Sequence, residues 1–477
     1  MIGPTSRQAS LFYFAFAKEA LAITDEVLDP IDPLLEDAPL LQLATQALAK
    51  RRQRSSDFGR PSIAPDRLLR CVVLKHVKDW SFRQLENELR ASLLYRRFTR
   101  FYEDPIPKFC SFSRTFALFG KEGTRQLHER VVQLAKEAAV AQGAKLRIDT
   151  TAVETHIHHP TDSSLLADGI RVLTRSLKYL SAACQKAFPV VEHKRAAKLR
   201  VLEICRAAKT LTEAGQQRLK ESYGKLLSLT RGVLQQSTLV LADWDQGKLV
   251  ARADAFITAL GAQSQLRHYL PLAQKVMDQT KARIFEGQTH YPEKILSLFE
   301  EHTVCIRKGK AHKPNEFGRL VRIDEVENGI VSNYHIPTTN LADQPQWKPA
   351  LEAHQLIFQR APHLAAADRG FWSAANEAAA ADLGVERTVL PGRGRLSASR
   401  AARQKERWFR RGQGWRAGIE SRISTLKHVF AMERAHYKGD PGFERYVGCC
   451  ILAQNLVALT RAKANKTEKT QPRSGSG

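Results

Sequence analysis

Lys145-Leu-Arg-Ile-Asp149-Thr-Thr-Ala-Val153 is the stretch around which the rest of the chain can be interpreted. Its alternating polar and apolar side chains predict a short β-strand, with Asp149 in the middle or at the end of the strand. A second strand is predicted by the small-residue run His363-Leu-Ala-Ala-Ala-Asp368, which ends in an acid and turns at Gly370. Each of these two strands therefore delivers one carboxylate to a sheet.

A third carboxylate belongs to Arg416-Ala-Gly-Ile-Glu420-Ser-Arg-Ile-Ser-Thr-Leu-Lys427, where it lies among basic residues at helical spacing. At about 100° per residue, Arg416, Glu420 and Lys427 project from one face of a helix. The apolar stripe that would hold this helix on a core consists of Ile419, Ile423 and Leu426. A carboxylate flanked by cations suits a metal ligand on a phosphate-binding surface. An ordinary salt bridge between Arg416 and Glu420 explains the same spacing.

Asp149, Asp368 and Glu420 together have the layout of an RNase H-like metal site, with two acids on strands and one on a late helix. Three clustered carboxylates repel one another strongly unless divalent cations neutralise them. Hard oxygen ligands favour magnesium or manganese over zinc. The expected cofactor is therefore Mg²⁺ or Mn²⁺, as a pair of ions.

From about residue 59 to 462 the chain resembles the DDE transposases of bacterial insertion sequences, and most closely the ISNCY-like group. The motifs that carry the resemblance are Arg147-Ile-Asp-Thr-Thr-Ala-Val-Glu154, His158-His-Pro-Thr-Asp-Ser-Ser-Leu-Leu-Ala-Asp-Gly-Ile-Arg-Val-Leu-Thr-Arg175, Ala367-Asp-Arg-Gly-Phe371, the Arg416-x3-Glu420-x6-Lys427 array and His436-Tyr-Lys-Gly439. Their combination is specific, whereas each alone is weak. The family signature has a Tyr three positions before the Arg, where this chain has Gln413.

The resemblance implies that Asp149, Asp368 and Glu420 form the catalytic, metal-binding triad, with Asp149 bridging two ions. It implies that Arg416 and Lys427 contact terminal DNA. The activity it implies is cleavage of DNA at insertion-sequence ends, followed by strand transfer into target DNA. The implied partners are terminal inverted repeats, target DNA and, by analogy, a second copy of the chain in a synaptic homodimer. Two alternatives remain open: a metal nuclease on the same fold without strand transfer, and a non-catalytic DNA-binding relative.

Composition points to a polyanionic partner independently of the resemblance. The chain has 477 residues, with 74 Lys plus Arg against 49 Asp plus Glu and a formal net charge of +25. Such an excess favours phosphate neutralisation and counterion release. An acidic membrane surface is a poorer partner, because no apolar run approaches the roughly 18 to 20 residues of a span. Scattered cysteines without a CxxC pair, and no secretory pattern, predict a cytoplasmic protein with reduced thiols. The family resemblance implies a bacterial, nucleoid-associated protein.

Positive charge is concentrated between Arg393 and Lys427, where Lys and Arg far outnumber the acids Glu406 and Glu420. Four glycines predict that much of this segment is loop. Interleaved aromatic residues suit a groove for unpaired or distorted DNA ends, although a solvated basic loop with buried Trp residues is the alternative. The residues assigned to DNA contact are Arg416, Lys427, Arg422, Trp415, Trp372 and Arg369.

The predicted fold class is an α/β RNase H-like catalytic core with a mixed sheet, an all-α N-terminal domain and a large α-helical insertion. The expected division is an N-terminal segment 1–58, an α-helical DNA-binding and assembly domain 59–143, the core at 144–162 and 301–462, the insertion at 163–300, and a disordered tail 463–477. Within 59–143, a helix from Pro65 and a capping box from Ser81 to Gln84 predict two helices with a brief turn. This pair suits either a helix-turn-helix reader of DNA, with Arg90, Arg96, Arg97 and Arg100, or a helical core.

Several other polar residues are weaker candidates. His156, His158 and His159 invite a zinc site but lack Cys or HExxH partners, so a polar loop is favoured. Glu154 is a candidate for supporting the triad, and Asp162 for capping a helix. Trp372 suits stacking on a displaced base or burial in the core. Asp324 and Asp343 have the sequence context of ordinary loop or strand-edge acids.

Overall fold

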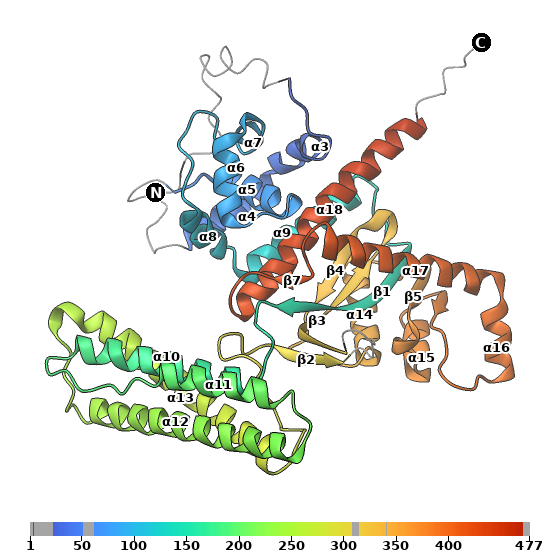
Figure 1. Cartoon of the computed structure of the whole chain (residues 1–477). Helices are drawn as coiled ribbons and strands as arrows, with labels where there is room; N and C mark the ends of the chain where they lie inside the picture. Colours follow the sequence, from blue (N-terminus) through green and yellow to red (C-terminus); the bar gives the residue numbers. More distant parts are fainter. Residues whose placement is uncertain (1–2, 4–21, 51–61, 308–313, 340, 471–477) are drawn as a thin grey trace. The chain divides into compact units, whose positions relative to one another are not determined.

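The computed structural model divides the chain into two compact units. Unit 1 comprises Met1–His156 and Ile306–Gly477, and unit 2 comprises Ile157–Cys305. The structure describes residue 3 and residues 22–50, 62–307, 314–339 and 341–470. Unit 1 is a mixed α/β fold with one sheet, and unit 2 is built from long helices (Figure 1).

The sheet of unit 1 has seven strands, with β2-β3-β1-β5-β6 as its main path. Their bounds are β1 Lys145–Thr155, β2 Val304–Arg307, β3 Asn315–Glu325, β4 Val331–His335, β5 Leu364–Ala367, β6 Arg387–Val389 and β7 Arg434–Ala435. β1 pairs antiparallel with β3 and parallel with β5, β5 pairs parallel with β6, and β4 and β7 join β3 and β1. The two acid-bearing strands predicted from the sequence are therefore confirmed as β1 and β5.

A tight turn connects β3 to β4, as the Asn328-Gly329 pair predicts. Asn328 has φ of 56° and Gly329 has φ of 76°, so both central residues are left-handed. Such a turn matches the twist of the two flanking strands and requires residue types that tolerate positive φ. The β3–β4 hairpin is thereby fixed in antiparallel register.

Three helices follow the strands of the C-terminal half: α14 Trp347–Phe358, α15 Ala374–Asp382 and α17 Arg407–His428. The interpretation of much of 393–427 as loop was wrong, because α16 Ala398–Lys405 precedes α17 and α17 begins at Arg407. Two residues explain the difference. Phe409 is buried, and Gly412 brings the helix so close to the sheet that an added Cβ would lie 2.6 Å from Val389 Cγ2. Here glycine permits close packing rather than breaking the helix.

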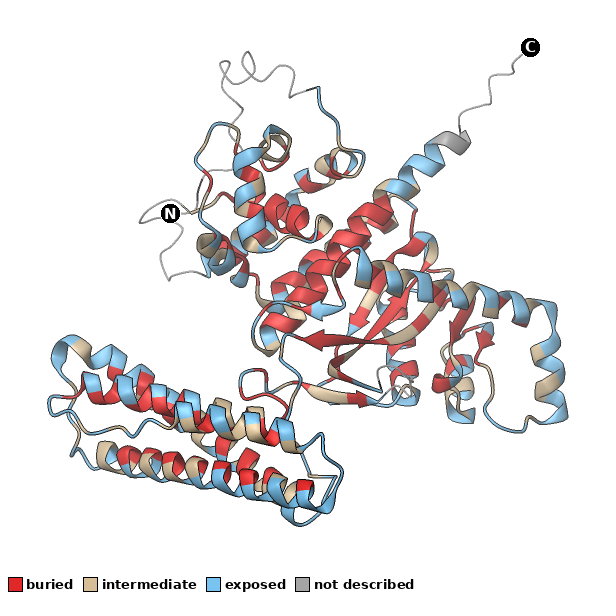
Figure 2. Cartoon of the chain, in the orientation of Figure 1, coloured by how far each residue is buried: buried red, intermediate tan, exposed pale blue. Residues whose placement is uncertain are grey.

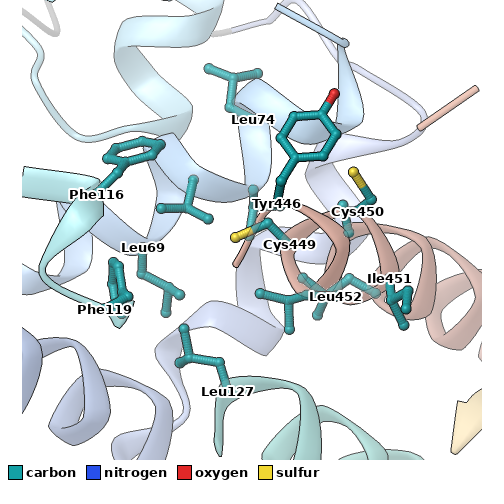
Figure 3. Close-up of a cluster of buried hydrophobic side chains, with 14 of the residues drawn as sticks. Leu69, Leu74, Phe116, Phe119, Leu127, Tyr446, Cys449, Cys450, Ile451 and Leu452 are labelled. Atoms are coloured by element: carbon teal, nitrogen blue, oxygen red, sulfur yellow. The ribbon is translucent and has the colours of Figure 1, made fainter. Parts of the chain in front are cut away.

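The remaining helices of unit 1 share one apolar core with α18 Asp440–Thr470. They are α3 Leu28–Ile31, α4 Ala38–Ala49, α5 Pro65–Val77, α6 Phe82–Ala91, α7 Leu93–Phe98, α8 Phe109–Ala117 and α9 Gly120–Glu137. Figure 3 shows Leu69 and Leu74 with Phe116 and Phe119 in one apolar cluster, together with the α18 residues Tyr446, Cys449, Cys450, Ile451 and Leu452. Cys449 and Cys450 are buried there as unpaired thiols.

The expectation of a disordered tail from residue 463 was wrong for 463–470, which continue α18. Lys466 Nζ donates to the carbonyl oxygens of Ala138 and Ala139, at 3.2 and 2.6 Å, and so holds this part of the helix against the C-terminal end of α9. Residues 471–477 lie outside the described residues, as do most of the basic run 50–54 and much of segment 1–58.

Unit 2 consists of α10 Asp162–Ala183, α11 Lys194–Ala207, α12 Glu213–Asp245 and α13 Phe256–Phe285 around its own apolar core. Figure 2 shows buried inner faces and exposed outer faces along these helices. The cap of α10 is Thr161 and not Asp162, because Thr161 and Ser164 form a capping box. Asp162 is instead buried and accepts from Arg283 Nη1 at 2.8 Å. Within the part of the chain that is described, no helix has the length and apolarity needed to cross a membrane.

Candidate functional site

Asp149 lies on the face of β1 that α17 covers. Leu146 and Ile148 are buried on the opposite face, and the strand alternation directs Arg147 and Asp149 the other way. Both side chains contact α17: Arg147 Nη1 donates to the Trp415 carbonyl oxygen at 2.5 Å, and Asp149 accepts from Arg416. The helix therefore lies directly over the strand that carries the first acid.

Asp368 is brought beside Asp149 by the parallel pairing of β1 and β5. Ile148 pairs with Ala367, so each acid immediately follows a paired residue on neighbouring strands. Neighbouring strands lie about 4.8 Å apart. Asp368 Oδ1 accepts from the Gly370 N–H at 2.7 Å, which fixes the carboxylate at the start of the turn after β5. The sheet thus brings together two of the three predicted acids.

Asp343 joins this pair and was missed by sequence analysis, which took it for an ordinary loop acid. Its Oδ1 accepts from Thr150 Oγ1 at 2.8 Å, next to Asp149. A Cβ added at Gly370 would lie 2.6 Å from Asp343 Oδ2 and 2.7 Å from Asp368 Oδ1, so both carboxylates border the same glycine. Asp343 occupies the N-cap position of the short helix Gln344–Gln346 without capping it. No local sequence signal distinguishes it from a capping acid.

Glu420 is linked to Asp149 through Arg416. Arg416 Nη2 lies 3.0 Å from Asp149 Oδ2, and Arg416 Nη1 lies 3.0 Å from Glu420 Oε1. The side chains of Asp149 and Arg416 are 15% and 19% exposed, whereas that of Glu420 is 67% exposed. The ordinary salt bridge between Arg416 and Glu420 is therefore present, and Arg416 also reaches the sheet acid. Metal binding by Glu420 stays a prediction.

Burial raises the pKa of Asp149 to about 6. Arg416 and the Thr150 N–H oppose this shift, because each stabilises the ionised form, while Asp368 and Asp343 add to it by repulsion. The upward shift thus comes mainly from burial, and the effect of Arg416 on this pKa is larger than that of either neighbouring acid. Across the described residues, no group of three His, Cys, Asp or Glu side chains is close enough to hold a metal ion as it stands.

A buried ion-pair network fixes α17 over β1. Glu325, which is fully buried, accepts from Arg147 Nε and Nη2 at 2.9 and 2.6 Å. Arg422 Nε from α17 donates to the same carboxylate at 3.3 Å. The Trp415 ring lies 5.0 Å from the Arg147 guanidinium carbon. Arg422 and Trp415, both predicted DNA contacts, are thus also part of the attachment of the helix to the sheet.

The other predicted DNA contacts lie around the two ends of the site. Arg369 is exposed directly after Asp368, and its carbonyl oxygen accepts from Arg393 Nε at 2.8 Å. Trp372 is half-buried beneath Arg400, whose guanidinium carbon lies 4.6 Å from the ring centre. Lys427 is half-buried on α17, eleven residues and about 16 Å along the helix from Arg416. DNA contact by these residues stays a prediction.

A cavity of about 470 Å³ lies beside Trp372. It is lined by Trp372 and by the arginines Arg393, Arg395, Arg400 and Arg403. The sequence predicted the basic and aromatic composition of this segment but not its arrangement as a hollow. An aromatic ring with several guanidinium groups offers contacts for bases and phosphates.

Two weaker sequence candidates have other roles. Glu154 lies five residues from Asp149 on β1, on the opposite face of the sheet, and pairs with Arg434 Nη2 at 2.6 Å. It therefore does not support the acid cluster. His158 Nε2 lies 2.9 Å from Asp168 Oδ2 in unit 2, and His156 contacts the ring of His436 in unit 1.

The predicted N-terminal helical pair, α5 and α6, packs within the protein. α5 is buried along nearly its whole length, and a left-handed Asp79 (φ of 51°) turns the chain into the Ser81 capping box of α6. The arginines expected on a DNA-reading helix bind within the protein. Arg96 donates to the carbonyl oxygens of Leu89 and Tyr102, and the remaining ion pairs are Arg90 with Glu86, Arg97 with Asp29 and Arg100 with Glu36.

Comparison with protein families places a transposase module in this helical region. Residues 17–118 match the family described as Transposase domain (DUF772). The match supports assignment of the chain to a transposase family. Comparison with curated proteins and with solved structures gives no match.

Proposed function

We propose that this protein is a DDE-type transposase, of the ISNCY-like group, that cleaves DNA at the ends of its insertion sequence and transfers the strands into target DNA. The observation that carries the proposal is the convergence of Asp149 on β1 and Asp368 directly after the adjacent strand β5, with Glu420 tied to Asp149 through Arg416. The transposase-domain match in the N-terminal region supports the same class of function.

The connectivity of unit 1 supports an RNase H-like core. The chain runs from the first acid-bearing strand through a helical unit to a hairpin, and then through helix, second acid-bearing strand, helix, strand and the helix of Glu420. This is the order that the family resemblance implies. Because the two ends of unit 2 attach at residues 156 and 306, the helical unit interrupts the core without separating β1 from β5.

The donor chemistry of the site fits a hard divalent cation, because Asp149, Asp368, Asp343 and Glu420 offer only carboxylate oxygens. Asp343 and Asp368 both border Gly370, so the site gathers carboxylates in a small space beside Asp149. Asp149, Asp368 and Glu420 would hold Mg²⁺ or Mn²⁺, with Asp343 positioned beside them. Two such ions supply activation of a water or a DNA 3′-hydroxyl and stabilisation of the leaving oxygen.

Arg416 has two roles in this proposal. In the protein alone its guanidinium neutralises Asp149 and orients Glu420. With its carboxylate partners neutralised by cations, Arg416 would be available to contact a phosphate of terminal DNA on the same helix face as Lys427. The expected partners are inverted-repeat ends, target DNA and a second copy of the chain at the bacterial nucleoid.

Substitution of the acids tests the proposal. Asp149→Asn, Asp368→Asn and Glu420→Gln should each abolish Mg²⁺-dependent cleavage of a duplex carrying the terminal repeat, while duplex binding changes less than about threefold. Asp382→Asn, on the exposed end of α15, is the matched control and should cleave normally. Full cleavage by all three acid variants would refute the assignment.

The same assay separates the alternatives. A metal nuclease would cut duplexes without the repeat equally well and would join no strands. A non-catalytic relative would bind the repeat without cutting it under any of the metal conditions. Only repeat-dependent cutting together with joined products supports the transposase.

A further inference from the structure

The helical unit 157–305 carries a surface that the catalytic proposal does not use. Four cations of α11 and two of α12 form what we call the basic band: Lys194, Arg195, Lys198, Arg206, Arg218 and Lys225. All six residues are exposed. Within described residues 157–305, none of the six has a carboxylate in an ion pair.

The four cations of α11 lie on one side of that helix. At about 100° per residue, positions 194, 195, 198 and 206 fall within an arc of about 120°. The opposite side carries Ala197 and Ile204, which are buried in the core of the unit. The cations therefore point outward together, over about 18 Å of helix, which is about half a turn of duplex DNA.

The two cations of α12 lie on the side of that helix next to α11. Residues 218, 225 and 232 are spaced by seven and so share one face. A Cβ added at Gly232 would lie 3.9 Å from Nε2 of His193, the residue before α11. Farther along the same face, Gln236 Nε2 donates to the Pro189 carbonyl oxygen. Arg218 and Lys225 consequently extend the band from α11 onto α12.

The other cations of the unit show a different pattern. Most of them are paired with acids, as in Arg171 with Asp168, Arg252 with Asp254 and Lys275 with Glu293. The exposed cations outside the band that have no ion pair in described residues 157–305 are Arg175, Lys186, Lys209, Lys220 and Arg231. Three acids near the band have partners outside it: Glu192 pairs with Lys178, Glu203 with Arg200, and Glu221 accepts from Gln217. Lys194 and Arg195 also lie close enough to Glu192 to help lower its pKa. Leu199 and Leu202 lie among the α11 cations and are 49% and 46% exposed, so this face also carries apolar contact area.

We propose that the basic band binds the phosphate backbone of duplex DNA without reading its sequence. The inference rests on the proposed function, which makes DNA the polyanion available to this chain. Unpaired cations recover free energy when they displace condensed counterions from phosphates, and each such contact makes affinity more dependent on salt. The exposed leucines would cover sugar edges between phosphate contacts. The unit would thus hold DNA beyond the cleaved end, as a second contact region separate from α17.

The test uses the full chain and a labelled duplex of about 40 base pairs without the terminal repeat. The band variant changes Lys194, Arg195, Lys198, Arg206, Arg218 and Lys225 to Ala. The control variant changes Arg171, Lys248, Arg252, Arg267, Lys275 and Lys281 to Ala, which removes the same number of Lys and Arg from cations that have acid partners. Circular dichroism first verifies that both variants keep their helix content.

Fluorescence anisotropy then gives the slope of log affinity against log salt concentration. We expect the band variant to reduce the magnitude of the slope by about 5, since six phosphate contacts contribute about 0.9 each, and the control variant to reduce it by less than 1. Equal slopes for the two variants would overturn the proposal, because net charge alone would then explain binding. The proposal would also be overturned if the band variant lost affinity for vesicles of anionic lipid while its slope for duplex DNA stayed unchanged.

Cleavage of a duplex that carries the terminal repeat distinguishes failure of the band proposal from failure of the proposed transposase function. If the band variant keeps its slope while Asp149→Asn still abolishes cleavage, the band proposal fails and the proposed function is supported. If the unmodified chain binds no duplex, both fail.

Discussion

Replacing Asp149 by Asn should remove activity and at the same time make the metal-free protein more stable at neutral pH. Asp149 has a pKa of about 6 in the folded chain against 3.8 for an ordinary Asp, because burial and the nearby acids disfavour its ionised form. A raised acid pKa means that ionisation costs folding free energy. The cost is absent below the unfolded pKa, grows between the two values and is complete above the folded one.

The magnitude follows from this difference in pKa. A separation of about 2 units at 1.36 kcal/mol each gives a cost of about 3 kcal/mol at pH 7.5, and about 1 kcal/mol at pH 4.5. Asn cannot ionise, so the advantage of the variant should grow by about 2 kcal/mol between these pH values. At about 2 °C per kcal/mol for a large domain, the difference in Tm between variant and unmodified chain should increase by about 4 °C.

Thermal unfolding in buffer with EDTA, at pH 4.5 and pH 7.5, measures this effect. Asp382→Asn, at an exposed position, should leave Tm unchanged at both pH values. Adding Mn²⁺ at pH 7.5 should raise the Tm of the unmodified chain but not that of Asp149→Asn, because a ligand that binds the native state stabilises it. A Tm difference that is the same at both pH values would refute the reasoning about Asp149.

Two further substitutions examine how the site is built. Glu325→Gln leaves Arg147 and Arg422 without their buried carboxylate and should lower the free energy of unfolding by about 3 to 5 kcal/mol, or Tm by about 6 to 10 °C. The control Glu352→Gln, in an exposed pair with Lys348, should change Tm by less than 1 °C. A similar Tm for the two variants would show that the network does not anchor α17. Gly370→Ala places a methyl group 2.6 Å from Asp343 Oδ2 and should lower Mg²⁺-dependent cleavage at least tenfold while far-ultraviolet circular dichroism is unchanged. Normal cleavage by that variant would exclude a tight arrangement of Asp343 and Asp368.

The local elements of the chain could be predicted because their signals are local. Alternation around Asp149, the Ala run before Asp368, the Asn328-Gly329 turn and the Ser81 capping box each fix backbone geometry through neighbouring residues, and all of these elements are present. The alignment of Arg416 and Glu420 follows from helix periodicity in the same way. The glycines of the basic segment wrongly predicted a loop, because the role of Gly412 is set by tertiary packing against Val389 of β6.

Contacts between distant segments could not be predicted from the residues alone. The approach of Asp343 to Asp368, the reach of Arg416 across to Asp149, and the burial of Glu325 between two arginines join positions separated by many residues. They depend on strand register and on the seating of α17, which no short sequence pattern encodes. The amino-acid sequence by itself determined which acids and cations the protein possesses and which strands and helices carry them. Only the tertiary structure decided which charges neutralise one another, because that depends on distances set by the packing of the sheet and its helices.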